Sequence, residues 1–314
     1  MNRTANAPHA GRADAAHPAP AAAAAATEHC SALLSMRRDG ARRPDIFVRW
    51  REPAPGARPA RPPVVVVHGF GEHSGRYLRV LDAIAEAGHA VVALDRRGYG
   101  RSAGRRGFVR SFHDYLEDVD LALQHAARLT GDATRPILLG HSMGGLVALD
   151  YALAHGERLG GLVLSSPALR FRVEVPAWKH LIGLAASRLW PTLSLPTGRD
   201  PSLLSRDPRN EREIHADPWI VARATARWYT ESRRAQRRVL AAAGTLQVPS
   251  LFLVAGDDRV VDPEATRRFY AGVPSSQHSW HRFEDGRHEL FQELPELRDE
   301  VLRTMLQWLA AQRP

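Results

Sequence analysis

The sequence G-H-S-M-G at residues 140–144 constrains the fold most strongly, because of the segments on either side of it. Residues 136–139 form a short apolar run of the kind that a buried parallel strand needs, and residues 145–153 are typical of a packed helix. A serine flanked by glycines at a sharp turn from strand to helix is the pattern of a nucleophile elbow. Glycines are needed because side chains at those positions would collide with the strand and the helix. The pattern therefore predicts that Ser142 is a nucleophile.

Length and composition exclude several other classes of protein. The 314 residues, 44% hydrophobic and 25% charged, are typical of a soluble globular chain that buries a sizeable core. The single cysteine, Cys30, excludes an intramolecular disulfide and a cysteine-rich metal site. No apolar stretch approaches the roughly 18 residues of a membrane span. Residues 1–27 are rich in alanine and proline and lack the apolar region of a secretory signal, so we expect a disordered leader and a cytoplasmic protein.

The net charge of +9 raises the question of a nucleic-acid partner. Arginine is spread from Arg3 to Arg313, and neither a zinc finger nor an RNA-binding signature occurs, whereas nucleic-acid binders concentrate basic residues on one face of a recognisable module. We therefore expect a solvated basic surface and no nucleic-acid partner. Attraction to anionic lipid surfaces stays open as a second interpretation.

Strand and helix patterns alternate along most of the chain. An amino-terminal hairpin is expected from residues 30–36 and 45–50, joined by a turn at 37–40. The further strands expected are residues 64–67, 90–94, 136–139, 162–165, 251–255 and 281–283. The helices expected are residues 77–85, 112–129, 145–153 and 296–312. Such alternation predicts an α/β fold with a mostly parallel sheet and helices on both faces.

The segment from about residue 169 to 248 breaks this alternation, because it contains helical patches rich in apolar and aromatic residues but no clear strand. These helices could simply pack on the sheet. We favour an inserted lid whose apolar inner face forms an acyl-chain tunnel, since the segment exceeds a usual connection several-fold. The expected organisation is a leader at 1–28, a core in two parts at 29–168 and 248–314, and a helical cap at 169–247.

A serine nucleophile needs a general base, and the base needs an acid that fixes its tautomer. The strand at residues 251–255 runs into an acidic turn, and sites of open α/β sheets lie at the carboxyl ends of strands. Asp257, Asp258 and Asp262 all compete for the acid. Asp262 stands before Pro263, as a helix N-cap would.

One of the 15 histidines best fits the base. His288 follows the acidic turn and lies in a glycine-bearing loop after the last expected strand. His278 and His281 fall before or inside that strand and are expected to be structural. The oxyanion of an acyl transfer needs two backbone N–H donors, which we expect from Met143, after the nucleophile, and from Phe70 in an H-G-F-G loop.

Together these motifs resemble the monoacylglycerol lipase and lysophospholipase group of α/β-hydrolases, also described as the serine aminopeptidase S33-type family. The resemblance runs from about residue 31 to the carboxyl terminus. It rests on H-G-F-G-E-H-S-G-R-Y at 68–77, D-R-R-G-Y-G-R-S at 95–102 with Tyr99 in place of the family's histidine, the elbow at 140–144, Asp258-Arg259, and His288 with E-L-P-E at 293–296.

The resemblance implies an α/β-hydrolase fold with a helical cap, a triad of Ser142, His288 and Asp258, and an oxyanion hole from Phe70 and Met143. It implies hydrolysis of the ester of a single-chain acyl lipid, without a cofactor or a metal. Peripheral contact of the cap with a membrane would accompany such a substrate.

The resemblance also implies three head-group contacts. Glu72 and Arg76 fall where the family's monoglyceride lipases hold the glyceryl group, although a local ion pair would equally explain them. Phe291 stands where eukaryotic members have a second histidine that contacts glycerol, which leaves the head group open.

Two alternative functions use the same scaffold. An acyltransferase or a thioesterase would share the triad and differ in the acceptor or the leaving group. A non-catalytic lipid carrier or membrane-associated binder would need neither the triad nor the oxyanion loop, so their joint presence argues against it. Dehalogenase or epoxide chemistry is disfavoured because the elbow carries serine and not aspartate. The fold alone does not distinguish these functions, because one fold can host many activities.

Overall fold

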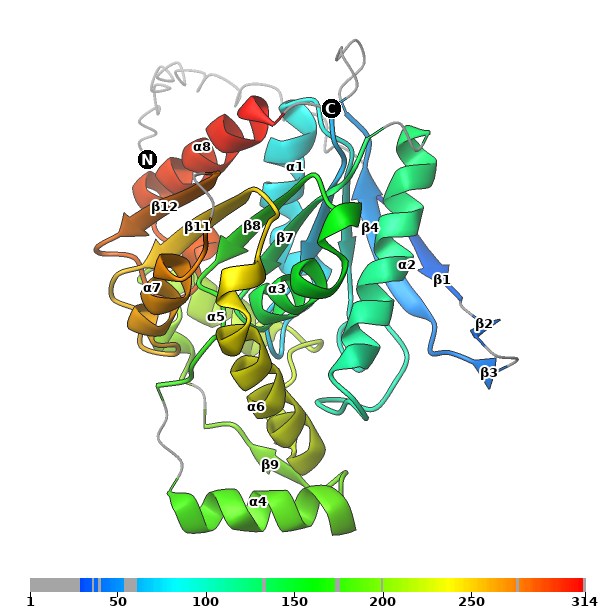
Figure 1. The fold of residues 1–314 in the computed structure, drawn as a ribbon, viewed down its shortest axis with the longest axis vertical. Coiled ribbons are helices and arrows are strands. Elements are labelled where there is room, and N and C mark those ends of the chain that lie inside the picture. Colours follow the sequence, from blue (N-terminus) through cyan, green and yellow to red (C-terminus); the bar gives the residue numbers. More distant parts are fainter. Residues whose placement is uncertain are drawn as a thin grey trace, which may run out of the picture.

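A twisted eight-stranded sheet forms the centre of the molecule, in the order β1-β4-β6-β5-β7-β8-β11-β12 (Figure 1). The computed structural model describes residues 29–35, 37–38, 41–53, 61–131, 134–172, 176–198, 200–274 and 277–312. The leader expected at 1–28 lies outside the described residues. The strands are β1 (Cys30–Leu34), β4 (Ile46–Arg51), β5 (Val64–Val67), β6 (Val91–Leu94), β7 (Ile137–His141), β8 (Gly161–Ser165), β11 (Ser250–Ala255) and β12 (His278–Phe283).

The expected α/β fold with a mostly parallel sheet is confirmed. Adjacent strands from β6 through β5 to β12 run parallel, and only β4 runs against its neighbours β1 and β6. Strand β5 shows why the centre is parallel: its four valines are all buried, as in a strand covered on both faces. The amino-terminal antiparallel pair is also confirmed, and a small hairpin of β2 (Arg37–Arg38) and β3 (Ala41–Arg42) is inserted between its strands.

Helices cover both faces of the sheet (Figure 1). One buried cluster joins the sheet to α1 (Leu78–Glu86) and α8 (Pro295–Ala311). The other joins it to α2 (His113–Thr130), α3 (Met143–His155) and α7 (Pro263–Ala271). The described residues also form five short 3₁₀ helices: Ser74–Tyr77, Gly156–Arg158, Pro201–Leu203, Ala243–Thr245 and Leu290–Gln292. No described helix is long and apolar enough to cross a membrane.

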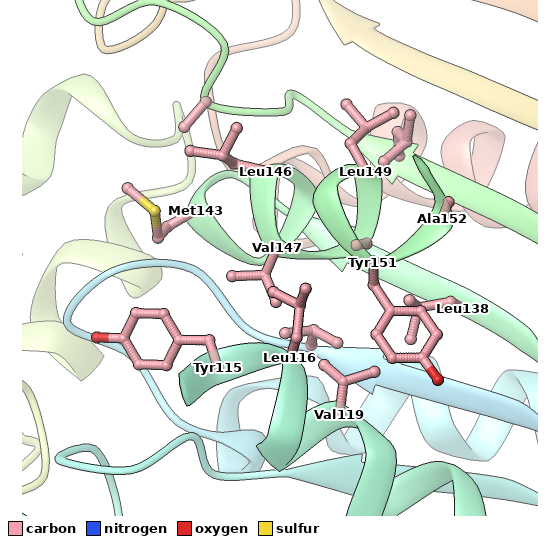
Figure 2. Close-up of a cluster of buried hydrophobic side chains, with 14 of the residues drawn as sticks. Tyr115, Leu116, Val119, Leu138, Met143, Leu146, Val147, Leu149, Tyr151 and Ala152 are labelled. Atoms are coloured by element: carbon pink, nitrogen blue, oxygen red, sulfur yellow. The ribbon is translucent and has the colours of Figure 1, made fainter. Parts of the chain in front are cut away.

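Helix α3 is apolar on all sides because it is enclosed by the sheet, α2 and the segment after β8. Every residue from Met143 to Ala152 is buried, which is the environment that a helix without a polar face requires. Figure 2 shows Val147 of α3 pointing toward Leu116 and Val119 of α2. This packing fixes the amino terminus of α3 rigidly beside the sheet.

The segment after β8 contains α4 (Ala177–Leu189), β9 (Ser194–Pro196), α5 (Pro208–Ala216), β10 (Arg223–Thr225) and α6 (Ala226–Ala241). We call these five elements the cap. Figure 1 shows α4 at the outer end of the cap, with α6 extending from it toward the sheet. The expectation of no strand here was wrong, because β9 and β10 pair antiparallel. Three residues are too few to produce a recognisable alternation of apolar residues.

The apolar residues of α4 are largely exposed, and the acyl-chain tunnel of the lid hypothesis stays a prediction. Trp178, Leu181 and Ile182 are 58 to 65% exposed, and Leu189 is 86% exposed. The buried apolar contact between cap and core comes instead from α6, where Trp228 packs on Phe70 with ring centroids 4.3 Å apart. The described contacts therefore place α6 against the core, whereas the apolar side chains of α4 stay largely exposed.

Candidate active site

The turn between β7 and α3 holds Ser142 in a conformation that few non-glycine residues adopt, with φ 51° and ψ −117°. Two neighbouring glycines make this turn possible. A Cβ on Gly140 would collide with the Gly144 backbone, and one on Gly144 would collide with the carbonyl oxygen of Val67. The strained serine is held by its backbone, because its N–H donates to the carbonyl of Ser165 at 2.9 Å. Its hydroxyl is therefore presented at the carboxyl end of β7.

His288 connects the serine to an acid. It lies in the loop after β12 and is buried. Its Nε2 is 2.8 Å from Oγ of Ser142, and its Nδ1 is 2.8 Å from Oδ2 of Asp258. Because an ionised carboxylate can only accept, the proton of a neutral ring lies on Nδ1 and leaves Nε2 free to accept from the serine hydroxyl.

Asp258 is the acid that the structure brings to His288. Its Oδ1 accepts the backbone N–H groups of Val260 and Val261, both at 2.9 Å, so the turn itself orients the carboxylate. Burial raises its pKa, but the charge of His288, its hydrogen bond and the two N–H groups outweigh burial and hold the pKa of Asp258 below its ordinary value.

The other two candidate acids have different roles. Asp257 is half-buried and pairs with Arg259 at 3.0 Å and with Arg287 at 3.8 Å. Asp262 caps α7 by accepting the N–H of Glu264 at 3.0 Å, which confirms the expected N-cap. His278 and His281 both lie within β12, which begins three residues earlier than the apolar pattern predicts.

The pKa of His288 is raised above its ordinary value. Burial alone would lower it, because the charged imidazolium is poorly solvated in the interior. The charge and hydrogen bond of Asp258 outweigh burial, and the carboxylates of Glu289 and Glu72 add to the effect. The ring is thus a base strengthened by nearby negative charge.

The loop after β5 carries Phe70, the expected oxyanion donor, and it lies against the elbow. Gly144 approaches the carbonyls of Val67 and His68 so closely that no side chain fits between them. Met143, the second expected donor, is the first residue of α3, where backbone N–H groups are not used within the helix. The loop after β5 and the first turn of α3 thus lie against each other, and the oxyanion role of Phe70 and Met143 stays a prediction.

A buried polar network lies behind the site and includes both expected head-group residues. Glu72 accepts from the Tyr77 hydroxyl at 2.9 Å, and Arg76 donates to Glu289 at 2.8 Å. Asn210 of α5 accepts from Arg76 at 2.6 Å and donates to the same Glu289 oxygen at 2.9 Å. The ion pair of Arg76 therefore forms with Glu289 and not with Glu72. Sequence reasoning missed Glu289 and Asn210, because the residues next to them in the sequence give no sign that these two side chains are buried and paired.

Three residues of this region could in principle hold a metal ion. Glu72, His141 and Glu289 are buried and place one ligand atom each within 4.8 Å of one another. The guanidinium of Arg76 already neutralises Glu289, and the pKa of His141 is lowered, chiefly by burial. The two carboxylates are thus accounted for within the protein, Glu289 by Arg76 and Glu72 by the Tyr77 hydroxyl.

Phe291, the third expected head-group residue, is buried in the cluster that also contains α8. Its neighbour Leu290 belongs to the same cluster. The contacts of Glu72, Arg76 and Phe291 with a head group stay predictions.

Comparison with known proteins supports the resemblance. A sequence profile of the family described as serine aminopeptidase, S33, matches residues 58–295. Phospholipase YtpA of Bacillus subtilis (strain 168) is 33% identical over 242 residues, which cover 75% of this chain and 90% of that protein. Human monoglyceride lipase is 32% identical over 252 residues, covering 79% of this chain and 82% of that protein.

A solved structure agrees with these matches. The crystal structure of Paleococcus ferrophilus monoacylglycerol lipase superimposes with a TM-score of 0.74 at 31% sequence identity, covering 81% of this chain and 97% of that one. The matched residues 58–295 include the elbow, the acidic turn and the loop of His288. The chain therefore belongs to the serine aminopeptidase S33 family, and it is an α/β-hydrolase of the carboxylic ester hydrolase class.

Proposed function

We propose that the chain hydrolyses esters of single-chain acyl lipids, monoacylglycerols or lysophospholipids, through an acyl-enzyme formed on Ser142. The observation that carries the proposal is His288 bridging Ser142 and Asp258 with two contacts of 2.8 Å. Relatives named monoglyceride lipase and phospholipase support the substrate class.

The proposed reaction has two acyl transfers. In the first, His288 takes the hydroxyl proton while Oγ of Ser142 attacks the ester carbonyl, and the N–H groups of Phe70 and Met143 bind the oxyanion. His288 then gives that proton to the leaving alcohol. In the second, water loses a proton to His288, attacks the acyl-enzyme and releases the acid and the free serine. No step requires a cofactor.

Product analysis tests this function against its alternatives. A panel of monoacylglycerols, lysophospholipids and short p-nitrophenyl esters would be ranked by kcat/KM, with Ser142→Ala as the blank. We expect free fatty acid as the product and the highest kcat/KM among single-chain lipid esters. Transfer of the acyl group to added alcohols, or preference for thioesters, would instead indicate an acyltransferase or a thioesterase. Liposome binding without any turnover would indicate a lipid carrier.

The pH at which kcat/KM rises to half of its maximum should lie above the ordinary pKa of histidine. The base must be neutral to accept the serine proton, and the pKa of His288 is raised above its ordinary value of 6.5. Activity is therefore lost as pH falls through that raised pKa. A pH profile of kcat/KM on a p-nitrophenyl ester measures it, and a midpoint below 6.5 would contradict the electrostatic account.

The outer side of α4 is the part of the cap best suited to contact a lipid surface, which is where a single-chain lipid ester resides. Four apolar side chains of α4 are more than half exposed, Trp178, Leu181, Ile182 and Leu189, and so is Trp190, which directly follows the helix. Large exposed apolar patches mark protein or membrane contacts, and tryptophan suits the membrane interface. The net charge of +9 would add attraction to anionic lipid.

Replacing Leu181 and Ile182 together by glutamate should weaken liposome co-sedimentation strongly while kcat on a water-soluble p-nitrophenyl ester stays within about two-fold. Both side chains are exposed, so the change removes apolar area without opening the core. Leu184 offers a control position on the same helix because it is less exposed. Unchanged sedimentation with anionic vesicles would contradict lipid contact through α4.

A further inference from the structure

Arg96 follows β6 and is fully buried, yet no carboxylate of the described residues forms an ion pair with it. Its Nη2 donates to the carbonyl of Gly69 at 2.8 Å, while its Nε and Nη1 have no hydrogen-bond partner in the described part of the chain. The guanidinium lies 4.9 Å from the ring centroid of Tyr99 and 4.7 Å from that of Tyr115. Burying an arginine in this way is unfavourable unless the residue is needed there.

A buried arginine is ordinarily stabilised by ion pairs, and the residue after Arg96 is an example. Arg97 is also buried, but it pairs with Asp118 at 2.7 Å and with Glu117 at 3.2 Å on α2. Arg97 therefore contributes an ion-pair network that joins the loop to α2. Arg96 contributes no such network and points instead to the loop that carries Phe70.

His68 binds the same carbonyl from a second direction. Its Nε2 accepts the backbone N–H of Arg96 at 3.0 Å, so the ring proton must lie on Nδ1. That Nδ1 lies 2.7 Å from the Gly69 carbonyl oxygen and donates to it. Burial, aided by the charge of Arg96, lowers the pKa of His68 well below its ordinary value, so the ring is neutral. The carbonyl of Gly69 thus accepts two hydrogen bonds.

These two bonds determine the orientation of a peptide group in the proposed site. In a trans peptide the carbonyl oxygen and the following N–H point in opposite directions, so fixing the Gly69 oxygen also fixes the N–H of Phe70. A peptide next to glycine can rotate easily, because glycine accepts conformations that other residues do not. On its other side Gly69 faces His141, whose Cδ2 would lie 3.2 Å from an added Cβ and which directly precedes Ser142.

We infer that Arg96 is a positioning residue for catalysis: together with His68 it holds the Gly69–Phe70 peptide in the orientation that presents the Phe70 N–H to the oxyanion. The inference rests on the proposed ester hydrolysis and deepens it. Tyr99, which stands where the family pattern has histidine, supplies one of the two aromatic faces that accommodate the buried cation. Its ring also contacts His68 and Phe70, with centroids 5.5 and 5.8 Å away.

The test compares Arg96→Met with Arg97→Met, because the two arginines are adjacent and both buried. For each variant, kcat and KM on a p-nitrophenyl ester, the Ki of a trifluoromethyl ketone that mimics the oxyanion, and the melting temperature would be measured. Loss of one oxyanion donor lowers kcat by about 10²–10³-fold. Arg96→Met loosens the donor without deleting it. We therefore expect it to lower kcat by a factor of about 10 to 100 and to raise the Ki of the ketone by a similar factor, with little change in KM.

The melting temperature separates positioning from structural support. Arg96→Met removes a buried charge that lacks an ion-pair partner, so its melting temperature should stay within about 4 °C of wild type. Arg97→Met breaks an ion-pair network, so it should lower the melting temperature while the folded protein keeps its kcat. Arg96→Lys retains a cationic donor and should recover most of the lost activity.

Two results would overturn the inference and leave the proposed function intact. In the first, Arg96→Met folds and keeps the kcat and the ketone affinity of wild type. In the second, the loss of kcat in Arg96→Met only follows the loss of folded protein, as measured by melting. Failure of the proposed function would show differently. The wild type itself would then neither turn over the ester nor react with a fluorophosphonate, and the inference would fall with it.

Discussion

Replacing Ser142 by alanine is expected to lower kcat for ester hydrolysis by about 10⁴-fold or more and to abolish labelling by a fluorophosphonate. The hydroxyl is the only group at the elbow that can form the acyl-enzyme, and its Oγ lies 2.8 Å from Nε2 of His288. Alanine adopts the strained backbone no worse than serine does, so the melting temperature should change little. Turnover of p-nitrophenyl esters and labelling in gel measure the effect.

Ser232 provides the matched control. It is fully buried on α6, and its hydroxyl forms no hydrogen bond to the triad among the described residues, so Ser232→Ala should keep both labelling and turnover. Undiminished turnover in a correctly folded Ser142→Ala variant would remove the proposed mechanism. Labelling that survives in Ser142→Ala but disappears in another serine variant would assign the nucleophile elsewhere.

The fold was largely predictable because its signals are local. The run of four valines in β5 and the glycines around Ser142 each fix a strand or a turn through neighbouring residues alone. Errors arose where local signals are weak. Strand β12, H-S-W-H-R-F, begins earlier than its apolar residues indicate, and β9 and β10 are too short to show a period.

The candidate site was predictable only where a residue is marked by its own neighbours. Ser142 and His288 are marked in this way, and the structure joins them. The choice among three aspartates could not be made from composition, because it depends on which carboxylate the N–H groups of Val260 and Val261 hold. The pairing of Arg76 with Glu289 joins residues 213 positions apart, and no local pattern encodes it.

The orientation of the cap could not be predicted for a related reason. Apolar periodicity shows that a helix has an apolar face, but it does not show what that face contacts. On α4 the face that includes Trp178 and Leu181 is exposed, whereas on α6 Trp228 is buried against Phe70. Both helices carry tryptophan, and only the tertiary arrangement distinguishes them.

Replacing Asp258 by asparagine is expected to lower kcat by about 10³- to 10⁴-fold. Asparagine can still accept the N–H groups of Val260 and Val261 through its oxygen, so the turn should persist. Its amide nitrogen would then face Nδ1 of His288 and donate to it. The ring proton would move to Nε2, which could no longer accept the proton of Ser142.

The adjacent Asp257→Asn variant is the matched control, because the Asp257 carboxylate pairs with Arg259 and Arg287 and not with His288. It should keep kcat within about two-fold of wild type. The pH profile provides a second readout: without the charge of Asp258 the pKa of His288 should fall, so the residual activity of Asp258→Asn should reach its plateau at lower pH. Equal losses in the two variants would show that the acidic turn, and not the carboxylate bound to His288, supports catalysis.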